Sequence, residues 1–408
     1  MSSTTANLKE IASSKAKERL RHFFESNTIL DLHRPAVPRL SILLVLYNRA
    51  ELTLACLQSI QPRLTEVGAE VVLVDNASRD ETGTLLDRLH GGKVIRNPDN
   101  RGFPIAVNQA AETASGEFLL LLNNDTEVLG DSLCTAVRFL ESNPDVGAAG
   151  GRIILLDGTL QEAGCTFWRE GHSFQYGRGD SPTGAEYLFQ RDVDYCSAAL
   201  LMTRRQLFAQ MGGLDTAFSP GYFEDGDYCV RLWRAGWRVV YLPEVAILHY
   251  ENGSAVSSTE TRALYHRNLP YFTQKHADWL AWQRPFGTSR LGMRGSHDDR
   301  FTILYLPGSE LPADDKVRWA NIAKTVWRLR ALNCFVTVYP LQTKEAISSR
   351  KIPNLPPDVE VLQGGCLDSL LDFLVERNEY YDGLLTDNAW IEEQIKQRLQ
   401  RDKTSLRA

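Results

Sequence analysis

The 408-residue sequence lacks the patterns that mark several large classes of protein. Its seven cysteines are scattered singly and never form a Cys-x-x-Cys pair, which is typical of reduced thiols that serve as small core residues. No apolar run approaches the roughly 18 residues that a membrane-spanning helix needs, and the N-terminus contains no apolar signal-peptide core. These absences predict a cytoplasmic protein, with any membrane contact peripheral and at the inner face of the cytoplasmic membrane.

The sequence also has no strong excess of charge of either sign. Its formal net charge is -6 and its pI is near 5.8, so the broad basic surface of a nucleic-acid-binding protein is not expected. Hydrophobic residues make up 43% and charged residues 24%, which is ordinary for a soluble globular protein. The length is sufficient for two domains with additional segments.

Short apolar runs alternate with helix-like segments from Ser41 onward. Ser78 and Glu81 have the spacing of a capping box, which predicts a helix that begins near Arg79 and ends at Gly91. The alternation predicts an α/β fold with a largely parallel, doubly wound sheet. The expected strands of this first region are residues 42–46, 71–74, 94–95 and 118–122.

Changes in composition divide the chain into four segments. Residues 1–38 form a leader with a loose helical face, which either packs on the main domain or lies on a membrane surface or partner. Residues 39–256 form the main α/β domain, and residues 257–297 form an aromatic-rich helical extension and linker. A second β/α pattern in residues 298–408 predicts a smaller Rossmann-like α/β segment.

Polar side chains follow the predicted strands, at the edge of the sheet where ligands of open parallel sheets bind. A nucleoside diphosphate laid along this edge could meet all of them. The turn after the first strand contains neither the GxGxxG of a dehydrogenase nor a Gly-rich, basic phosphate loop of a nucleotidyltransferase. The residues that follow the first, second and fourth strands are Tyr47, Asn48, Arg49, Asp75, Asn76, Asn123, Asn124 and Asp125.

Three runs far apart in the chain carry side chains suited to metal-assisted group transfer. Asp125 is a carboxylate that can hold a metal, and His249 is a further metal-capable side chain after a later strand. Glu224 and Asp225 stand just before a predicted helix, whose positive end favours the ionised form of Asp225. An ionised carboxylate beside an acceptor hydroxyl can act as a general base. Asp227 is expected to be only a helix N-terminal acid.

The order and surroundings of these runs resemble the family 2 glycosyltransferases, which have a GT-A fold with a mixed sheet. The matching stretches are SILLVLYNR (41–49), VVLVDNASRDET (71–82), the block 96–128, YFEDGDYCVRLWRAGW (222–237) and HYENGS (249–254). The resemblance therefore extends over most of residues 39–256.

By this resemblance, Asp75 contacts the donor nucleotide, while Asp125 and His249 hold Mg²⁺ or Mn²⁺. The sequence departs from the family's DxD motif, because Asn123-Asn124-Asp125 retains only the last acid. One carboxylate can still hold a divalent cation if diphosphate oxygens complete its shell. The residues implied in nucleotide-sugar binding are Tyr47, Asn48, Arg49, Asp75, Asn76, Asn100, Arg101, Gly102, Asn123 and Asn124.

The implied activity is an inverting, metal-dependent glycosyl transfer, with Asp225 as the base and Glu224 orienting groups beside it. The motifs are most similar to those of rhamnosyltransferases and other enzymes of O-antigen and cell-envelope polysaccharide biosynthesis. The expected donor is dTDP-rhamnose, with UDP-sugars next, and the expected acceptor is a glycan or lipid-linked glycan of the bacterial surface. A non-catalytic glycan-binding or scaffold subunit of a polysaccharide assembly complex is the alternative hypothesis.

Two features leave alternatives open. Trp168, Tyr195 and Trp233 are candidates for stacking on an acceptor sugar or for ordinary packing. The segment from residue 298 resembles the N-terminal half of a GT-B glycosyltransferase, but it contains no phosphate loop or catalytic motif. It is expected to be either a scaffold or part of a second transferase that continues beyond Ala408, and further glycosyltransferase domains or subunits would then be partners.

Overall fold

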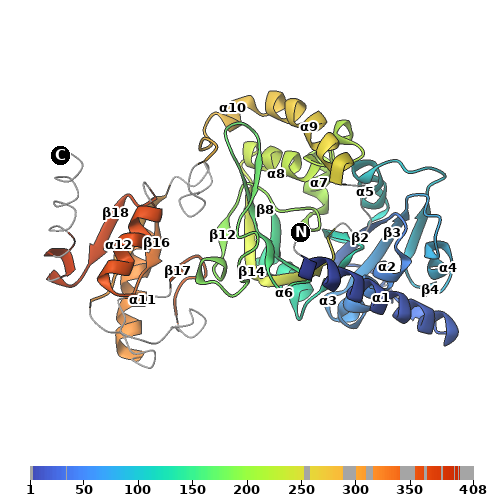
Figure 1. The fold of residues 1–408 in the computed structure, drawn as a ribbon, viewed down its shortest axis with the longest axis horizontal. Coiled ribbons are helices and arrows are strands. Elements are labelled where there is room, and N and C mark those ends of the chain that lie inside the picture. The colour runs from blue at the N-terminus through green and yellow to red at the C-terminus, as the bar shows by residue number, and fades with distance from the viewer. Residues whose placement is uncertain are drawn as a thin grey trace. The chain divides into compact units, whose positions relative to one another are not determined.

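The computed structural model describes residues 3–33, 35–251, 258–287, 300–308, 316–340, 354–362, 365–377, 380–389, 391–393 and 395 (Figure 1). They form two compact units. The first unit contains the residues up to 182 and those from 191 to 286, and the second contains residues 183–190 and those from 298 onward.

The sheet of the first unit has ten strands, with the order β12-β14-β8-β13-β6-β2-β3-β5, and with β7 paired to β14 and β9 to β8. The pairs among β6, β2, β3 and β5 are parallel, whereas β13 runs antiparallel to both β6 and β8. The sheet is therefore mixed. Its strands are β2 (Leu40–Leu46), β3 (Ala69–Asp75), β5 (Lys93–Arg96), β6 (Phe118–Asn123), β7 (Thr126–Val128), β8 (Val146–Leu155), β9 (Leu160–Ala163), β12 (Arg191–Asp192), β13 (Leu200–Arg204) and β14 (Arg238–His249).

Helices cover both faces of this sheet. Alternate residues of β2, such as Ile42 and Leu44, share a core with Leu54 and Leu57 of α2 and with Leu140 of α6. Helices α5 and α8 contact the sheet elsewhere, α5 at β2 and β3 and α8 at β14 and β8. The helices are α1 (Ser3–Glu25), α2 (Ala50–Ile60), α3 (Leu64–Val67), α4 (Thr82–Leu86), α5 (Phe103–Thr113), α6 (Ser132–Ser142), α7 (Arg205–Gln210), α8 (Glu224–Arg234), α9 (Ser258–Lys275) and α10 (Ala277–Leu280).

Short elements complete the first unit. The strands β1 and β4 form one two-stranded sheet, and β10 and β11 form another. Of the three 3-10 helices, η2 (Ala185–Tyr187) belongs to the second unit. The remaining short elements are β1 (Leu30–Asp31), β4 (Leu89–His90), β10 (Cys165–Phe167), β11 (Ser173–Gln175), η1 (Gln61–Arg63) and η3 (Thr216–Phe218).

The capping-box prediction is wrong, because its side chains bond to a different loop. The backbone N–H of Asn48 donates to Ser78 Oγ (2.8 Å), and that of Ala50 donates to Asp80 Oδ2 (3.0 Å). Helix α4 consequently begins at Thr82 rather than near Arg79, and Leu89 and His90, which were expected in its last turn, form β4 instead.

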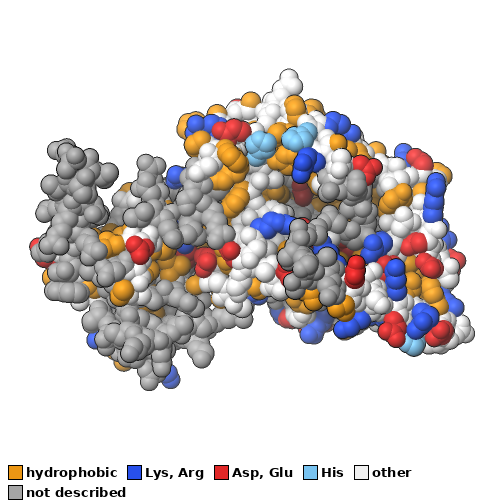
Figure 2. Space-filling model, in the orientation of Figure 1, with side chains coloured by type: hydrophobic (Ala, Val, Ile, Leu, Met, Phe, Trp, Pro, Cys, Tyr) orange, Lys and Arg blue, Asp and Glu red, His pale blue; other side chains and the backbone are white. Residues whose placement is uncertain are grey.

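The N-terminal helix α1 packs on the first unit. Leu20 and Phe23 are buried in the same core as α2, and Lys9 Nζ donates to the carbonyl of Glu251 (3.0 Å). Among the helices that the structure describes, none is both long and apolar enough to span a bilayer. On the face in view, basic and acidic side chains of the described residues are interspersed (Figure 2).

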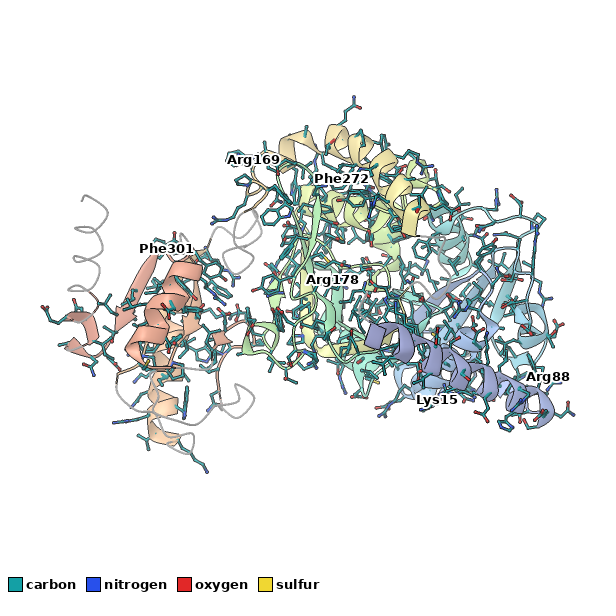
Figure 3. All side chains as sticks on the ribbon, viewed as in Figure 1. Lys15, Arg88, Arg169, Arg178, Phe272 and Phe301 are labelled. Atoms are coloured by element: carbon teal, nitrogen blue, oxygen red, sulfur yellow. The ribbon has the colours of Figure 1, made fainter. Side chains whose placement is uncertain are left out.

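The second unit contains a four-stranded parallel sheet with the order β17-β16-β15-β18, so the expected smaller α/β segment is present. Trp319 and Val326 of α11 pack on one face of the sheet, and Leu370 and Ile391 pack on the other. Figure 3 labels Phe301, the first residue of β15. The elements are β15 (Phe301–Leu306), α11 (Lys316–Ala331), β16 (Cys334–Val338), β17 (Glu360–Val361), α12 (Leu367–Glu376) and β18 (Gly383–Thr386).

A buried carboxylate ties the start of β3 to the segment before β6. Glu70 Oε1 accepts hydrogen bonds from Ser41 Oγ (2.7 Å) and from the backbone N–H of Ser115 (2.6 Å), while Lys93 Nζ lies 3.0 Å from Glu70 Oε2. Burial opposes the charge of Glu70, but these hydrogen bonds lower its pKa to about 2.

We expect Glu70→Gln to lower the free energy of unfolding at pH 7 by about 1–3 kcal/mol, because it removes a charged hydrogen-bond acceptor from a buried network. With the folded-state pKa near 2, the contribution of Glu70 is present above its ordinary pKa of 4.5 and is lost as pH falls toward 2. Urea unfolding at pH 7, 5 and 4 should show that the difference between wild type and variant shrinks as pH falls. The exposed Glu66→Gln is the control, and an equal difference at all three pH values would contradict the prediction.

Candidate active site

A cavity of about 530 Å³ in the first unit collects the three runs that the sequence singled out. Asp125 reaches it from the turn between β6 and β7, Glu224 and Asp225 from the start of α8, and His249 from the end of β14. Other walls are formed by the loop before β13 and by α9. The lining includes Asn123, Gln161, Glu162, Phe167, Gln175, Tyr195, Ser197, Ala198, Tyr222, Phe223 and Tyr265.

Strand pairing brings Asp125 and His249 together. β7 runs antiparallel to β14 with Thr126 opposite His249, so Asp125 lies beside the histidine. His249 Nε2 is 3.1 Å from Asp125 Oδ1, and both side chains are buried. The backbone N–H of Tyr250 also donates to the carbonyl of Asp125 (2.9 Å). The rest of the HYENGS run, residues 252–254, lies outside the described residues.

This pair has the chemistry of a divalent cation site. Gln161 Oε1 lies 2.6 Å from His249 Nδ1, and a proton on Nδ1 would leave the lone pair of Nε2 for a cation. Burial disfavours the charged form of His249, but the neighbouring Asp125 carboxylate raises the pKa of the imidazole above its ordinary value. A carboxylate oxygen and an imidazole nitrogen this close together can share one coordination shell, so the residues fit a bound Mg²⁺ or Mn²⁺.

The adjacent acids Glu224 and Asp225 form the first turn of α8. Asp225 accepts hydrogen bonds from the backbone N–H groups of Ala198 (3.1 Å) and Gly226 (2.8 Å). Burial raises the pKa of Asp225, while burial together with the charge of Asp225 raises that of Glu224 well above its usual range. Among the described residues, Glu224 Oε2 is buried with no hydrogen-bond partner. Of the two acids, Glu224 therefore binds a proton more readily, and Asp225 is the more readily ionised.

The residues predicted to meet the nucleotide around Asp75 gather at the carboxyl edge of β3. Asn76 Nδ2 donates to Asn100 Oδ1 (2.8 Å), and the backbone N–H of Arg101 donates to Asn76 Oδ1 (3.1 Å). Gly102 has a φ of 83°, and a Cβ there would lie 2.2 Å from Ser219 Oγ, so the loop requires glycine at this position. These residues lie close to one another, but they do not line the 530 Å³ cavity.

Three further nucleotide candidates, Tyr47, Asn48 and Arg49, follow β2. Tyr47 is 38% exposed, and Asn48 Oδ1 accepts from the backbone N–H of Arg79 (2.7 Å). Arg49 Nε bonds to Glu51 Oε1 (2.9 Å).

The two asparagines before Asp125 differ in their surroundings. Asn123 lines the cavity. Asn124 is buried and donates to Thr53 Oγ1 of α2 (2.9 Å). The structure therefore places Asn124 as an anchor for the turn that carries Asp125.

Only Tyr195 of the three acceptor candidates lines the cavity, where its ring stacks on Phe167 with centroids 4.7 Å apart. Trp168 is buried and packs against Phe174. Trp233 Nε1 donates to the carbonyl of Val193 (3.0 Å). Neither tryptophan lines the cavity.

Sequence reasoning missed Gln161 and Glu162, which lie on β9. Glu162 is buried, accepts from the backbone N–H of Ser197 (3.3 Å) and from Gln175 Nε2 (3.3 Å), and has a pKa raised by burial and by Asp225. The available signal was a polar Gln-Glu pair between the apolar residues Leu160 and Ala163.

Asp227 has a larger role than the predicted helix N-terminal acid. It is fully buried and contacts Lys275 Nζ (2.6 Å), His276 Nε2 (2.8 Å) and Arg231 Nε (2.8 Å). These contacts tie α8 to the end of α9 and the start of α10. His276 therefore has a structural role that the sequence did not predict.

Several known proteins are similar to this chain in sequence. Residues 41–210 match the family model described as glycosyl transferase family 2. The O-antigen biosynthesis protein RfbC of Myxococcus xanthus is 31% identical over 232 residues, which are 53% of this chain and 18% of that protein. The N-acetylglucosaminyl-diphospho-decaprenol L-rhamnosyltransferase of Mycobacterium tuberculosis is 26% identical over 261 residues, which are 57% of this chain and 82% of that protein.

A crystal structure of GalNAc-T7 with UDP, GalNAc and Mn²⁺ is similar with a TM-score of 0.47 and 17% identity, over 60% of this chain and 50% of that chain. The match to RfbC spans less than a fifth of that protein. Residues 41–210 are therefore similar to glycosyl transferase family 2, and the mixed sheet agrees with the α/β fold that the sequence predicts.

Proposed function

We propose that the first unit is an inverting, metal-dependent glycosyltransferase. The observation that carries the proposal is that one cavity is lined both by the Asp125–His249 pair, which fits a divalent cation, and by Asp225, a buried carboxylate at the start of a helix. Mg²⁺ or Mn²⁺ at the pair would supply positive charge for a departing diphosphate. We also propose the division of the chain into residues 1–38, 39–256, 257–297 and 298–408, with the transferase in residues 39–256.

The chain's own residues account for the proton transfer. Asp225 takes the proton of an acceptor hydroxyl, and the hydroxyl oxygen forms a bond to the anomeric carbon of the donor. The bond from that carbon to the diphosphate oxygen breaks, and its electron pair leaves with the diphosphate. A single displacement of this kind inverts the anomeric centre. Burial and the charge of Asp225 raise the pKa of Glu224, and in its protonated form Glu224 would donate a hydrogen bond to the acceptor beside Asp225.

The relatives supply the proposed substrates. The mycobacterial relative is named as an L-rhamnosyltransferase acting on a diphospho-decaprenol glycan, and this chain matches 82% of its length. We therefore favour dTDP-rhamnose as donor, with UDP-sugars next, and a glycan or lipid-linked glycan of the bacterial surface as acceptor. A cytoplasmic enzyme in peripheral contact with the inner face of the membrane would suit such an acceptor.

We expect Asp225→Asn to lower the rate of nucleoside diphosphate release by about 10²–10⁴-fold, because an amide cannot take the acceptor proton. Release would be measured from dTDP-rhamnose and from UDP- and GDP-sugars with a diphospho-lipid glycan acceptor, with Mn²⁺, with Mg²⁺ and with chelator. The exposed Asp131→Asn is the matched control and should keep the wild-type rate. A variant at position 225 that retains more than a tenth of the rate would rule out the base role. Absence of release from every donor, with no metal-dependent nucleotide binding by calorimetry, would favour the scaffold hypothesis.

We expect Gln161→Ala to raise the Mn²⁺ concentration needed for half-maximal activity by about 10–100-fold, because Gln161 orients the imidazole of His249. The rate at saturating Mn²⁺ should change much less. Activity would be titrated with Mn²⁺ from a metal-free preparation, alongside the exposed control Gln210→Ala. An unchanged Mn²⁺ requirement would mean that Gln161 does not position a metal ligand.

A further inference from the structure

The sheet of the second unit has a point at which its connections reverse direction. From β15 the chain proceeds to β16 and then to β17 on one side, and it returns to place β18 on the other side of β15. All three strand pairs are parallel, so the carboxyl ends of β15 and β18 lie side by side. Ligands of open α/β sheets bind in the crevice at such a switch point.

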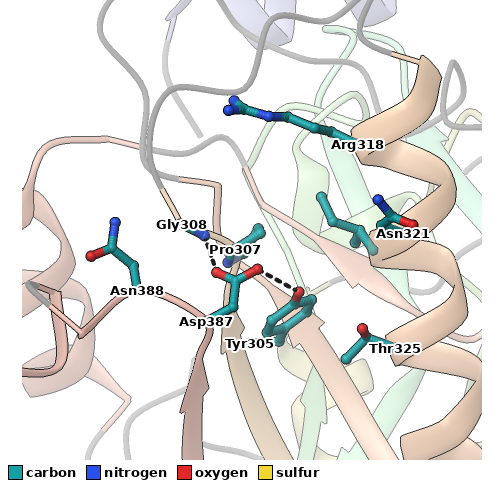
Figure 4. A pocket seen from close by; sticks show the side chains of 9 residues that line it. Tyr305, Pro307, Gly308, Arg318, Asn321, Thr325, Asp387 and Asn388 are labelled. Carbon is teal, nitrogen blue, oxygen red and sulfur yellow. Dashed lines mark hydrogen bonds between the residues drawn. The ribbon is translucent and has the colours of Figure 1, made fainter.

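A cavity of about 320 Å³ lies at this position (Figure 4). Pro307 and Gly308 line it from the end of β15, and Asp387 and Asn388 line it from the end of β18. Its volume lies in the range of roughly 300–1,000 Å³ that is typical of small-molecule sites. The cavity is formed within the second unit, and none of the residues argued above for glycosyl transfer lines it.

The helix α11 directs polar side chains toward this cavity. Arg318, Asn321 and Thr325 have the spacing i, i+3 and i+7 of one helical face, and all three line the cavity. Trp319 and Val326, on the other side of the helix, are buried in the core. Ile322, which belongs to the same core, also lines the cavity beside the polar stripe.

Asp387 joins the two strand ends and faces the cavity. Its Oδ1 accepts a hydrogen bond from the backbone N–H of Gly308, and Tyr305 OH donates to its Oδ2 (3.4 Å). Burial and the charge of Asp387 both raise the pKa of Tyr305, so this phenol keeps its proton. In Figure 4, Asn388 lies to the left of Asp387, and the side chain of Arg318 extends from α11 to a position above it. A carboxylate, two amides, two hydroxyls and a guanidinium thus line one cavity.

We propose that this cavity binds a phosphorylated sugar. Asp387 would accept hydrogen bonds from sugar hydroxyls, while Asn321, Thr325 and Asn388 both donate and accept. Arg318 supplies the cation that a phosphate requires. The proposal is independent of the transfer reaction assigned to the first unit.

Isothermal titration calorimetry of the full chain in chelator tests this site. The probes are α-D-glucose 1-phosphate, D-ribose 5-phosphate, the two unphosphorylated sugars and inorganic phosphate. We expect at least one sugar phosphate to bind tenfold or more tightly than its neutral sugar and than inorganic phosphate. Equal binding of inorganic phosphate would reduce the site to a simple anion site, and binding of none of the probes would overturn the proposal.

Variants assign the binding to this cavity. Asp387→Asn should weaken the sugar phosphate at least tenfold, and Arg318→Gln should remove the advantage of the sugar phosphate over the neutral sugar. The exposed Arg328→Gln of the same helix is the matched control and should bind as wild type does. Asp125→Asn in the first unit should also leave the affinity unchanged. Binding that Asp125→Asn abolishes and Asp387→Asn spares would overturn the assignment.

Folding of the variants would be checked by circular dichroism and thermal unfolding. If Asp387→Asn does not fold, Asn388→Ala replaces it as the test. We expect Asn388→Ala to weaken binding of the sugar phosphate at least threefold, and wild-type affinity would contradict the proposal.

Discussion

The candidate active site depends on the pairing of β7 with β14, since this ladder places Asp125 beside His249 although 124 residues separate them. The same strand β14 also runs parallel to β8, with a register shift between Leu242 and Ala246. At this irregularity a Cβ on Gly151 would lie 2.2 Å from the carbonyl of Val245, so only glycine allows the two strands to approach. The proposed cation site therefore rests on the backbone of the sheet rather than on a flexible loop, which favours a fixed geometry for its two candidate ligands.

Burial of several acids in one cavity is the second constraint. Asp125, Glu162, Glu224 and Asp225 all line the same space, and burial raises the pKa values of the last three. Such a cluster is costly without positive charge nearby. The fold supplies some compensation through backbone N–H groups at Asp225 and through the imidazole at Asp125. A divalent cation would offset the rest, which links the stability of the site to the chemistry proposed for it.

The sequence predicted those parts of the molecule that local patterns determine. Apolar runs predicted β2, β3, β5 and β6, and the three motifs predicted a site shared by Asp125, Asp225 and His249, which line one cavity. Tertiary contacts decided the rest. The hydroxyl of Ser78 caps no helix because it accepts from Asn48 across the sheet edge, and Asn124 turns inward to Thr53. Gln161 and Glu162 lie on a four-residue strand in a region without clear periodicity, so only the fold reveals that they reach the cavity.

Two acids of the first turn of α8, Asp225 and Asp227, show how surroundings shift the pKa values of identical side chains in opposite directions. The pKa of Asp225 is raised by burial, with only backbone N–H groups opposing the shift. Burial acts on Asp227 in the same direction, but His276, Arg231 and Lys275 outweigh it and lower its pKa. Asp227 is thereby held in its ionised form and anchors α9. The same helix α9 brings Tyr265 to the cavity wall and packs Phe272 (labelled in Figure 3) against Phe167. Asp225, two residues away, is left without a basic partner among its hydrogen-bond donors, and this is the condition under which a carboxylate can accept a proton from substrate.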